Sequence, residues 1–131
     1  MRNSLLLLLP AALVSCAAAP QAASAPQPQD NIARAALGER VYVDGPHVTP
    51  LEVLEDSRCP INARCVWAGR VRVSVKIDLG SGSANYIIGN DEPIRIADGH
   101  LSLEEVQPSL KAGEKAAPGD YRFGFTFAGG L

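Results

Sequence analysis

The fold is decided by one stretch of the chain, VRVSVKIDL at residues 71–79. Its valines, isoleucine and leucine occupy every second position, and polar or charged residues fill the positions between them. A period of two is typical of a β-strand with one face buried and the other in water. Residues 121–127, YRFGFTF, repeat the pattern and contain all three phenylalanines. We expect this second strand to lie centrally against the core.

Shorter strands are expected on either side of these two. Residues 41–43, 51–53 and 85–88 carry apolar residues between segments rich in glycine, proline and other turn formers. Together with a hairpin at residues 94–103 they make about seven short strands, and no long helical stretch is present. The sequence therefore predicts an all-β domain, a small antiparallel β-sandwich of immunoglobulin-like type, with a small barrel as the alternative.

The hairpin is indicated by the Asp98-Gly99 pair, which is a preferred two-residue turn. With these two residues in the loop, Ile96 pairs with Leu101 and Ile94 pairs with Leu103. All four apolar side chains then share one face, so the turn chemistry and the hydrophobic pattern agree on the register.

Composition limits the class of protein. The 131 residues include 12 Lys+Arg and 14 Asp+Glu, so the basic excess of a nucleic-acid-binding protein is missing. A hydrophobic content of 47% with 20% charged residues argues against disorder throughout. The longest apolar run is far shorter than the roughly 20 residues of a membrane-spanning helix. We expect one folded domain and no nucleic-acid partner.

The N-terminal segment has the features of an export signal. Arg2 supplies a positive charge, and residues 5–14 form an apolar stretch that is broken only by Pro10. The adjoining residues, Leu13-Val14-Ser15-Cys16, resemble the lipobox of bacterial lipoproteins. In that family the signal is removed just before the cysteine, and acyl chains such as palmitate are attached to it. The resemblance implies a signal peptide at residues 1–15 and a lipid anchor on Cys16.

The number of cysteines supports this assignment. The chain has three cysteines, and an unpaired thiol in an exported protein requires an explanation. A lipid on Cys16 leaves Cys59 and Cys65 as one pair. Alanine at position 17 resembles the sorting pattern of outer-membrane lipoproteins, which implies an outer-membrane location facing the periplasm. Cleavage near residues 17–19, which would give a plain secreted protein, is the alternative.

Residues 17–30, AAAPQAASAPQPQD, are expected to be a spacer. They offer no apolar face to bury, and their prolines favour local polyproline II structure. Residues 16–30 are therefore interpreted as a lipidated tether, and residues 31–131 as the β-sandwich domain.

One segment between predicted strands is distinctive, EDSRCPINARCVWAG at residues 55–69. In an exported chain a disulfide between Cys59 and Cys65 is the default, and it should stabilise the fold by about 2 kcal/mol. The segment resembles the D-S-R-C-P-x4-C-x-W-x-G signature of small uncharacterised bacterial lipoproteins and exported proteins, and it matches every position from Asp56 to Gly69. The resemblance implies the fold and the envelope location, and it carries over no active site.

Trp67 is the only tryptophan, and its side chain has two possible environments. If the following strand runs back unbroken, Trp67 shares the core face of Val71 and packs against the disulfide, which is the interpretation favoured by the burial of most tryptophans. A bulge at residues 68–69 would instead turn it outward. It would then form a binding surface with Arg58 and Arg64.

The sequence predicts no catalytic, metal or cofactor site. His47 and His100 lie in turn regions, and the C-x5-C spacing suits neither zinc nor a redox pair. Ser57 lacks the surroundings of a nucleophile elbow. Residues 44–45 and 90–92 have the composition of solvated turns.

We therefore expect a non-enzymatic binding module, held to the membrane at Cys16 and in contact with another envelope protein. A protease-inhibitor-like module that offers Arg58 or Arg64 from a rigid disulfide loop is the alternative. The two arginines must be exposed for that role and not held by nearby carboxylates such as Asp56.

Overall fold

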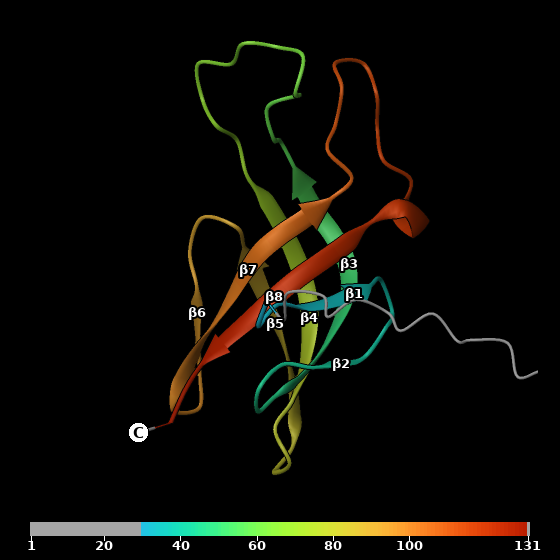
Figure 1. The fold of residues 1–131 in the computed structure, drawn as a ribbon. Helices are drawn as coiled ribbons and strands as arrows, with labels where there is room; N and C mark the ends of the chain where they lie inside the picture. The colour runs from blue at the N-terminus through green and yellow to red at the C-terminus, as the bar shows by residue number, and fades with distance from the viewer. Residues whose placement is uncertain (1–29, 131) are drawn as a thin grey trace, which may run out of the picture.

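The computed structural model of the chain describes residues 30–130. Two four-stranded antiparallel sheets pack together, with strand orders β1-β8-β7-β6 and β2-β3-β4-β5 (Figure 1). No helix within this range is long and apolar enough to cross a membrane. The elements are β1 (Ala33–Ala36), β2 (Val41–Tyr42), β3 (His47–Asp56), β4 (Val71–Asp78), β5 (Ser83–Gly89), β6 (Ile94–Ile96), β7 (Gly99–Gln107), the short 3-10 helix η1 (Pro118–Asp120) and β8 (Arg122–Ala128).

The predicted all-β sandwich is confirmed, with eight strands where about seven were expected. The unexpected strand is β1, whose sequence ARAA has neither β-branched residues nor an alternation of large apolar residues. It forms because it pairs with β8 along its whole length and buries Ala35. Except for β1, neighbours in each sheet are neighbours in the chain, unlike the strand order of immunoglobulin domains. The likeness to that fold is therefore limited to two packed antiparallel sheets.

The core lies between the two sheets and is built on the two strands that the sequence singled out. β4 lies between β3 and β5, and β8 lies between β1 and β7, so both are central in their sheets. Their alternating apolar side chains point at each other and exclude water. The fully buried members are Val71, Val73, Val75 and Ile77 of β4, and Phe123 and Phe125 of β8.

The β6–β7 hairpin is present, but its predicted register is wrong. Ile94 pairs with Leu101 and not with Leu103, so Gly99 lies in β7 and not in the turn. This strand position requires glycine, because a Cβ would clash with the backbone of Ala128 and Gly129 and with the Phe127 ring. The shift is two residues, so the apolar side chains stay on the buried face.

The predictions for the signal peptide at residues 1–15, for Cys16 and for residues 17–29 of the tether lie outside the described residues. The last tether residue, Asp30, makes an ion pair of 2.6 Å with Arg34 of β1. Arg34 also pairs with Glu105 of β7 at 2.8 Å. The start of the domain is thus bonded to the sheet that contains β8.

Two long loops project from the same end of the sandwich, at the top of Figure 1. The β3–β4 loop comprises residues 57–70 and contains all but the first two residues of the distinctive segment. The second loop, residues 108–117, connects β7 to η1. Because β3 and β7 both end here and β4 and β8 both begin here, the fold brings together four chain segments that are far apart in the sequence.

Candidate functional site

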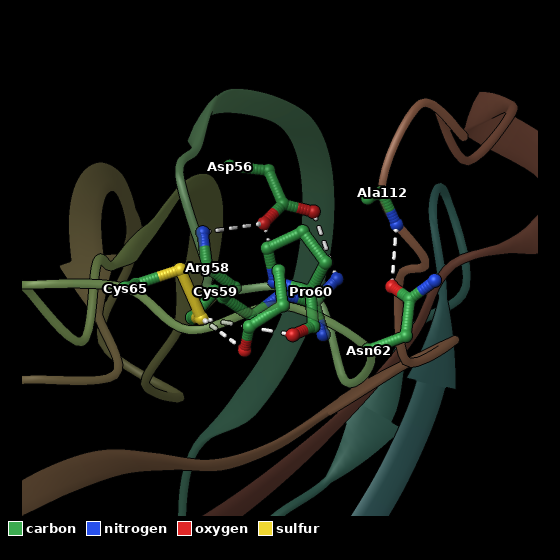
Figure 2. The surroundings of a disulfide bond; sticks show 8 residues. Asp56, Arg58, Cys59, Pro60, Asn62, Cys65 and Ala112 are labelled. Carbon is green, nitrogen blue, oxygen red and sulfur yellow. Dashed lines mark hydrogen bonds and ion pairs between the residues drawn. A yellow bond between two sulfur atoms is a disulfide. The ribbon is translucent and has the colours of Figure 1, made fainter.

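The β3–β4 loop contains the predicted disulfide between Cys59 and Cys65, whose Cα atoms are 5.9 Å apart (Figure 2). The base of the loop continues the β3–β4 ladder, because the Ser57 amide donates to the Arg70 carbonyl at 2.9 Å. The Ser57 hydroxyl also accepts from the Arg70 amide at 3.1 Å. The loop is therefore closed twice, by backbone pairing at its base and by the disulfide further out.

A cluster of three polar side chains lies under this loop. Nε and Nη2 of Arg58 each donate to a different carboxylate oxygen of Asp56, both at 2.8 Å. Nη1 of Arg58 donates to the Val106 carbonyl at 2.9 Å. The Tyr121 hydroxyl donates to Asp56 Oδ2 at 2.8 Å. With side chains only 9% and 17% exposed, Asp56 and Arg58 form a sheltered bidentate ion pair that is bonded to both β7 and the start of β8.

The ionisation of this cluster follows from its contacts. Burial alone would raise the pKa of Asp56, but the hydrogen bonds from Arg58 and Tyr121 and the charge of Arg58 hold it below its ordinary value. The hydrogen bond to Asp56 raises the pKa of Arg58. Burial and the neighbouring Asp56 carboxylate raise the pKa of Tyr121 to about 12. At neutral pH the cluster is an aspartate, an arginine cation and a neutral phenol that donates its hydrogen.

The two loops are bonded to each other beside this cluster. The Ile61 amide donates to the Leu110 carbonyl at 2.9 Å. The Ala112 amide donates to Oδ1 of Asn62 at 2.8 Å, as Figure 2 shows. A pocket of about 340 Å³ lies between them. Nothing in the sequence of residues 108–117 indicated this role, since the segment has no motif. The pocket is lined by Asp56, Arg58, Pro60, Leu110, Lys111, Gly113, Glu114, Lys115, Ala116 and Tyr121.

The outer part of the β3–β4 loop is exposed and apolar. Val66 is 90% exposed, Trp67 is 82% exposed and Ile61 is 67% exposed. The favoured prediction, that Trp67 lies in the core and packs against the disulfide, is wrong. β4 begins only at Val71, so the alternation that defines its buried face does not extend back to Trp67.

Gly69 is where the chain leaves the strand pattern. It has a φ of +68°, which is the left-handed region, and a Cβ at this position would clash with the Ser57 carbonyl. The close approach of the two loop ends thus requires glycine. The alternative prediction, a bulge at residues 68–69 that turns Trp67 outward, agrees with the left-handed backbone at Gly69 and the exposure of Trp67.

Of the three residues predicted for a binding surface, two are exposed. Arg64 and Trp67 lie on the exposed part of the loop. Arg58 does not, because Asp56 and the β7 backbone hold its guanidinium. Arg58 is therefore a residue of the structural framework. The sequence could show that Asp56 is close to Arg58, but it could not show Tyr121, which is 65 residues from Asp56.

The fold and the site define a small antiparallel β-sandwich with a disulfide-closed, exposed loop at one end. Within residues 30–130, no group of three or more histidine, cysteine, aspartate or glutamate side chains could hold a metal ion. Comparisons with protein-family models, with curated protein sequences and with solved structures give no match.

Proposed function

We propose that the protein is a lipid-anchored protein of the bacterial envelope whose β-sandwich binds another envelope protein through the tip of the β3–β4 loop. The loop tip is defined here as residues 61–67. The observation that carries the proposal is the adjacent pair Val66 and Trp67, both almost fully exposed on a loop that a disulfide closes above its base. Tryptophan is enriched among the residues that dominate binding energy at interfaces.

The way the loop is held favours binding. The disulfide, the Asp56–Arg58 pair and the bonds to residues 108–117 restrain the loop before any partner arrives. A restrained loop loses little conformational entropy on association, so more of the contact energy appears as affinity. Arg64 next to the apolar pair adds a cation to the surface, and arginine is also enriched at interfaces.

A crosslinking experiment tests the loop tip. A photoreactive residue at position 66 should form an adduct with an envelope protein in intact membranes, and Trp67→Ala should reduce the yield about tenfold, the effect of losing one strong contact. The same photoreactive residue at position 42, where the exposed Tyr42 lies on β2, is the matched control and should give no such adduct. Equal adducts at both positions, or a yield that Trp67→Ala leaves unchanged, would contradict the proposal.

The anchor is tested separately. The lipobox resemblance and the use of Cys59 and Cys65 in a disulfide support Cys16 as the lipidated residue. Cys16→Ser should abolish labelling by a radioactive or clickable fatty acid, whereas Cys59→Ser should retain it. If labelling survives in Cys16→Ser, the lipid anchor at Cys16 is wrong. The proposal would then be reduced to a secreted binding module.

The inhibitor alternative depends on Arg64 alone, because Arg58 is bonded to Asp56 and cannot enter a protease pocket without breaking three hydrogen bonds. The inhibitor alternative would replace the binding proposal if the protein inhibited a trypsin-like protease. That inhibition should be lost in Arg64→Ala and kept in Trp67→Ala.

A further inference from the structure

The outer edge of β5 has no neighbouring strand. β5 is the last strand of the sheet β2-β3-β4-β5, and within residues 30–130 it pairs only with β4. The facing sheet ends in β6, which has only three residues. One edge of the sandwich is therefore a seven-residue strand whose outer hydrogen-bonding groups have no strand partner in the described part of the chain.

The hydrogen bonds at the two ends of the β4–β5 hairpin show which groups these are. Leu79 donates to Gly82 at 2.9 Å, and Asn90 donates to Val71 at 3.3 Å. Bonded and non-bonded pairs alternate along an antiparallel ladder, so the bonds to β4 fall on every second residue between these ends. The remaining residues direct their N–H and C=O groups away from β4. They are Ser83, Asn85, Ile87 and Gly89.

This edge lacks the features that usually prevent pairing with another chain. Its sequence, SANYIIG, contains no charged residue and no proline, and the β4–β5 register has no bulge. Tyr86 is only partly buried against the core, and Ile87 is 49% exposed on the opposite face. A strand added here would cover apolar surface on both faces of the sheet.

We propose that β5 pairs antiparallel with β5 of a second copy of this chain, about a two-fold axis that passes beside Tyr86. Asn85 then lies opposite Ile87 of the second copy, and Ser83 lies opposite Gly89 of the second copy. Every free N–H and C=O of the edge has a partner in this register, because the free groups lie on alternate residues in both copies. The two sheets become one continuous sheet across the dimer.

Charge complementarity favours a second copy in this register, but its effect is small because the charges concerned are three strand spacings, about 14 Å, apart. Two uncharged strands meet without repulsion. In the β4–β5 ladder, Arg72 lies opposite Gly89, and Asp78 lies opposite Ser83. Pairing Ser83 with Gly89 therefore puts Arg72 of one copy in the same row as Asp78 of the other. The neighbouring register, with Ile87 opposite Ile87, would instead place two cations, Arg72 and Lys76, in one row with the two β5 strands between them.

A cysteine at position 86 tests the register in the full chain. Facing residues at a non-hydrogen-bonded antiparallel pair have Cα atoms about 4.5 Å apart, which is within the range of a disulfide. Under mild oxidation in the native membrane, Tyr86→Cys should give a disulfide-linked dimer on a non-reducing gel. The parent chain, Tyr42→Cys and Ile87→Cys should stay monomeric. A dimer in the parent chain would point to a free thiol at Cys16, which is a failure of the anchor and not of this proposal.

Two added substitutions test the hydrogen bonds. Ile87→Pro removes an N–H that faces away from β4, a position that an edge strand tolerates, so it should abolish the Tyr86→Cys dimer without unfolding the domain. Ile87→Thr keeps the N–H and should retain the dimer. Asn85→Pro serves the same purpose should Ile87→Pro fail to fold. The proposal would be overturned if Tyr86→Cys gave no dimer, and a different chain would then be the partner of this edge. It would also be overturned if Ile87→Cys gave more dimer than Tyr86→Cys, or if the dimer survived both proline substitutions.

Discussion

The hydroxyl of Tyr121 donates to Oδ2 of Asp56 at 2.8 Å, and this bond joins the two sheets at the end where the loops project. Asp56 is the last residue of β3 in one sheet, and Tyr121 directly precedes β8 in the other. The same carboxylate accepts two hydrogen bonds from the guanidinium of Arg58 at the start of the β3–β4 loop. One aspartate therefore fixes the loop to both halves of the sandwich.

Removing this carboxylate should be strongly destabilising. We expect Asp56→Ala to lower the free energy of unfolding by about 3 kcal/mol, because it leaves the sheltered Arg58 cation without its partner. Tyr121→Phe should cost about 1 kcal/mol, the value of one hydrogen bond. Asp91→Ala is the control, since Asp91 is exposed and 3.9 Å from Arg70, and it should change stability by less than about 0.5 kcal/mol. Urea denaturation measures all three, and similar losses for Asp56→Ala and Asp91→Ala would contradict the role assigned to Asp56.

The lowered pKa of Asp56 predicts a pH dependence of stability. A carboxyl group whose pKa is lower in the folded state stabilises the fold above its unfolded pKa of about 3.9, and this contribution is lost as the pH falls through the folded pKa. The difference in unfolding free energy between the native chain and Asp56→Asn should therefore be constant above about pH 5 and shrink below about pH 4. The other acidic groups are present in both proteins, so their contributions cancel in this difference in unfolding free energy. A difference that is independent of pH down to pH 2 would exclude this linkage.

Tyr121 should ionise late. Its pKa of about 12 is raised by burial first and then by the Asp56 carboxylate. In an absorbance titration of the phenolate band, Asp56→Asn should lower this pKa part of the way toward 10, because burial remains. The phenol favours folding below its unfolded pKa of about 10, and this contribution declines as the pH rises toward 12. Tyr121→Phe is the control, because it should lack the ionisation near pH 12. If that ionisation persists in Tyr121→Phe, it does not belong to Tyr121.

Reduction of the disulfide should act on stability and leave Trp67 emission unchanged. Loop closure between Cys59 and Cys65 predicts a loss of about 2 kcal/mol in the chain-entropy account. Because Trp67 is already exposed, its emission maximum should stay at the long wavelength of a solvated indole before and after reduction. A shift to longer wavelength on reduction would mean that the ring is packed in the oxidised protein. Cys59→Ser with Cys65→Ser provides the same comparison without a reducing agent.

Alanine substitutions at Gly69 and Gly113 distinguish the stability cost of an unfavourable backbone conformation from that of a steric clash. Both have positive φ, but a Cβ at Gly69 would clash with the Ser57 carbonyl, whereas nothing lies within 4 Å of a Cβ at Gly113. Gly113→Ala should therefore cost about 1 kcal/mol, the price of a left-handed alanine. Gly69→Ala should cost distinctly more, because the loop base must also move. Equal melting temperatures for the two variants would show that the close approach of the loop ends is not required.

The sequence alone determined the fold class and the two central strands. The alternation at residues 71–79 and at residues 121–127 has a period that only a half-buried strand satisfies, and these strands form the core. The Cys59–Cys65 pairing was also readable, because an exported chain with Cys16 assigned to a lipid leaves these two cysteines as one pair. Local spacing and residue counts are features that a sequence displays directly.

Tertiary structure decided what local spacing could not show. β1 is a strand because β8 offers it an edge, and its own residues have little strand preference. The position of β7 that Gly99 occupies has no room for a side chain, because Ala128, Gly129 and Phe127 lie against it. Arg58 is sheltered because Tyr121 and residues 108–117 approach the loop from the far end of the chain. Trp67 is exposed because β4 begins only at Val71. Contacts between residues so far apart in the sequence leave no periodic signal, so only the folded arrangement of the strands reveals them.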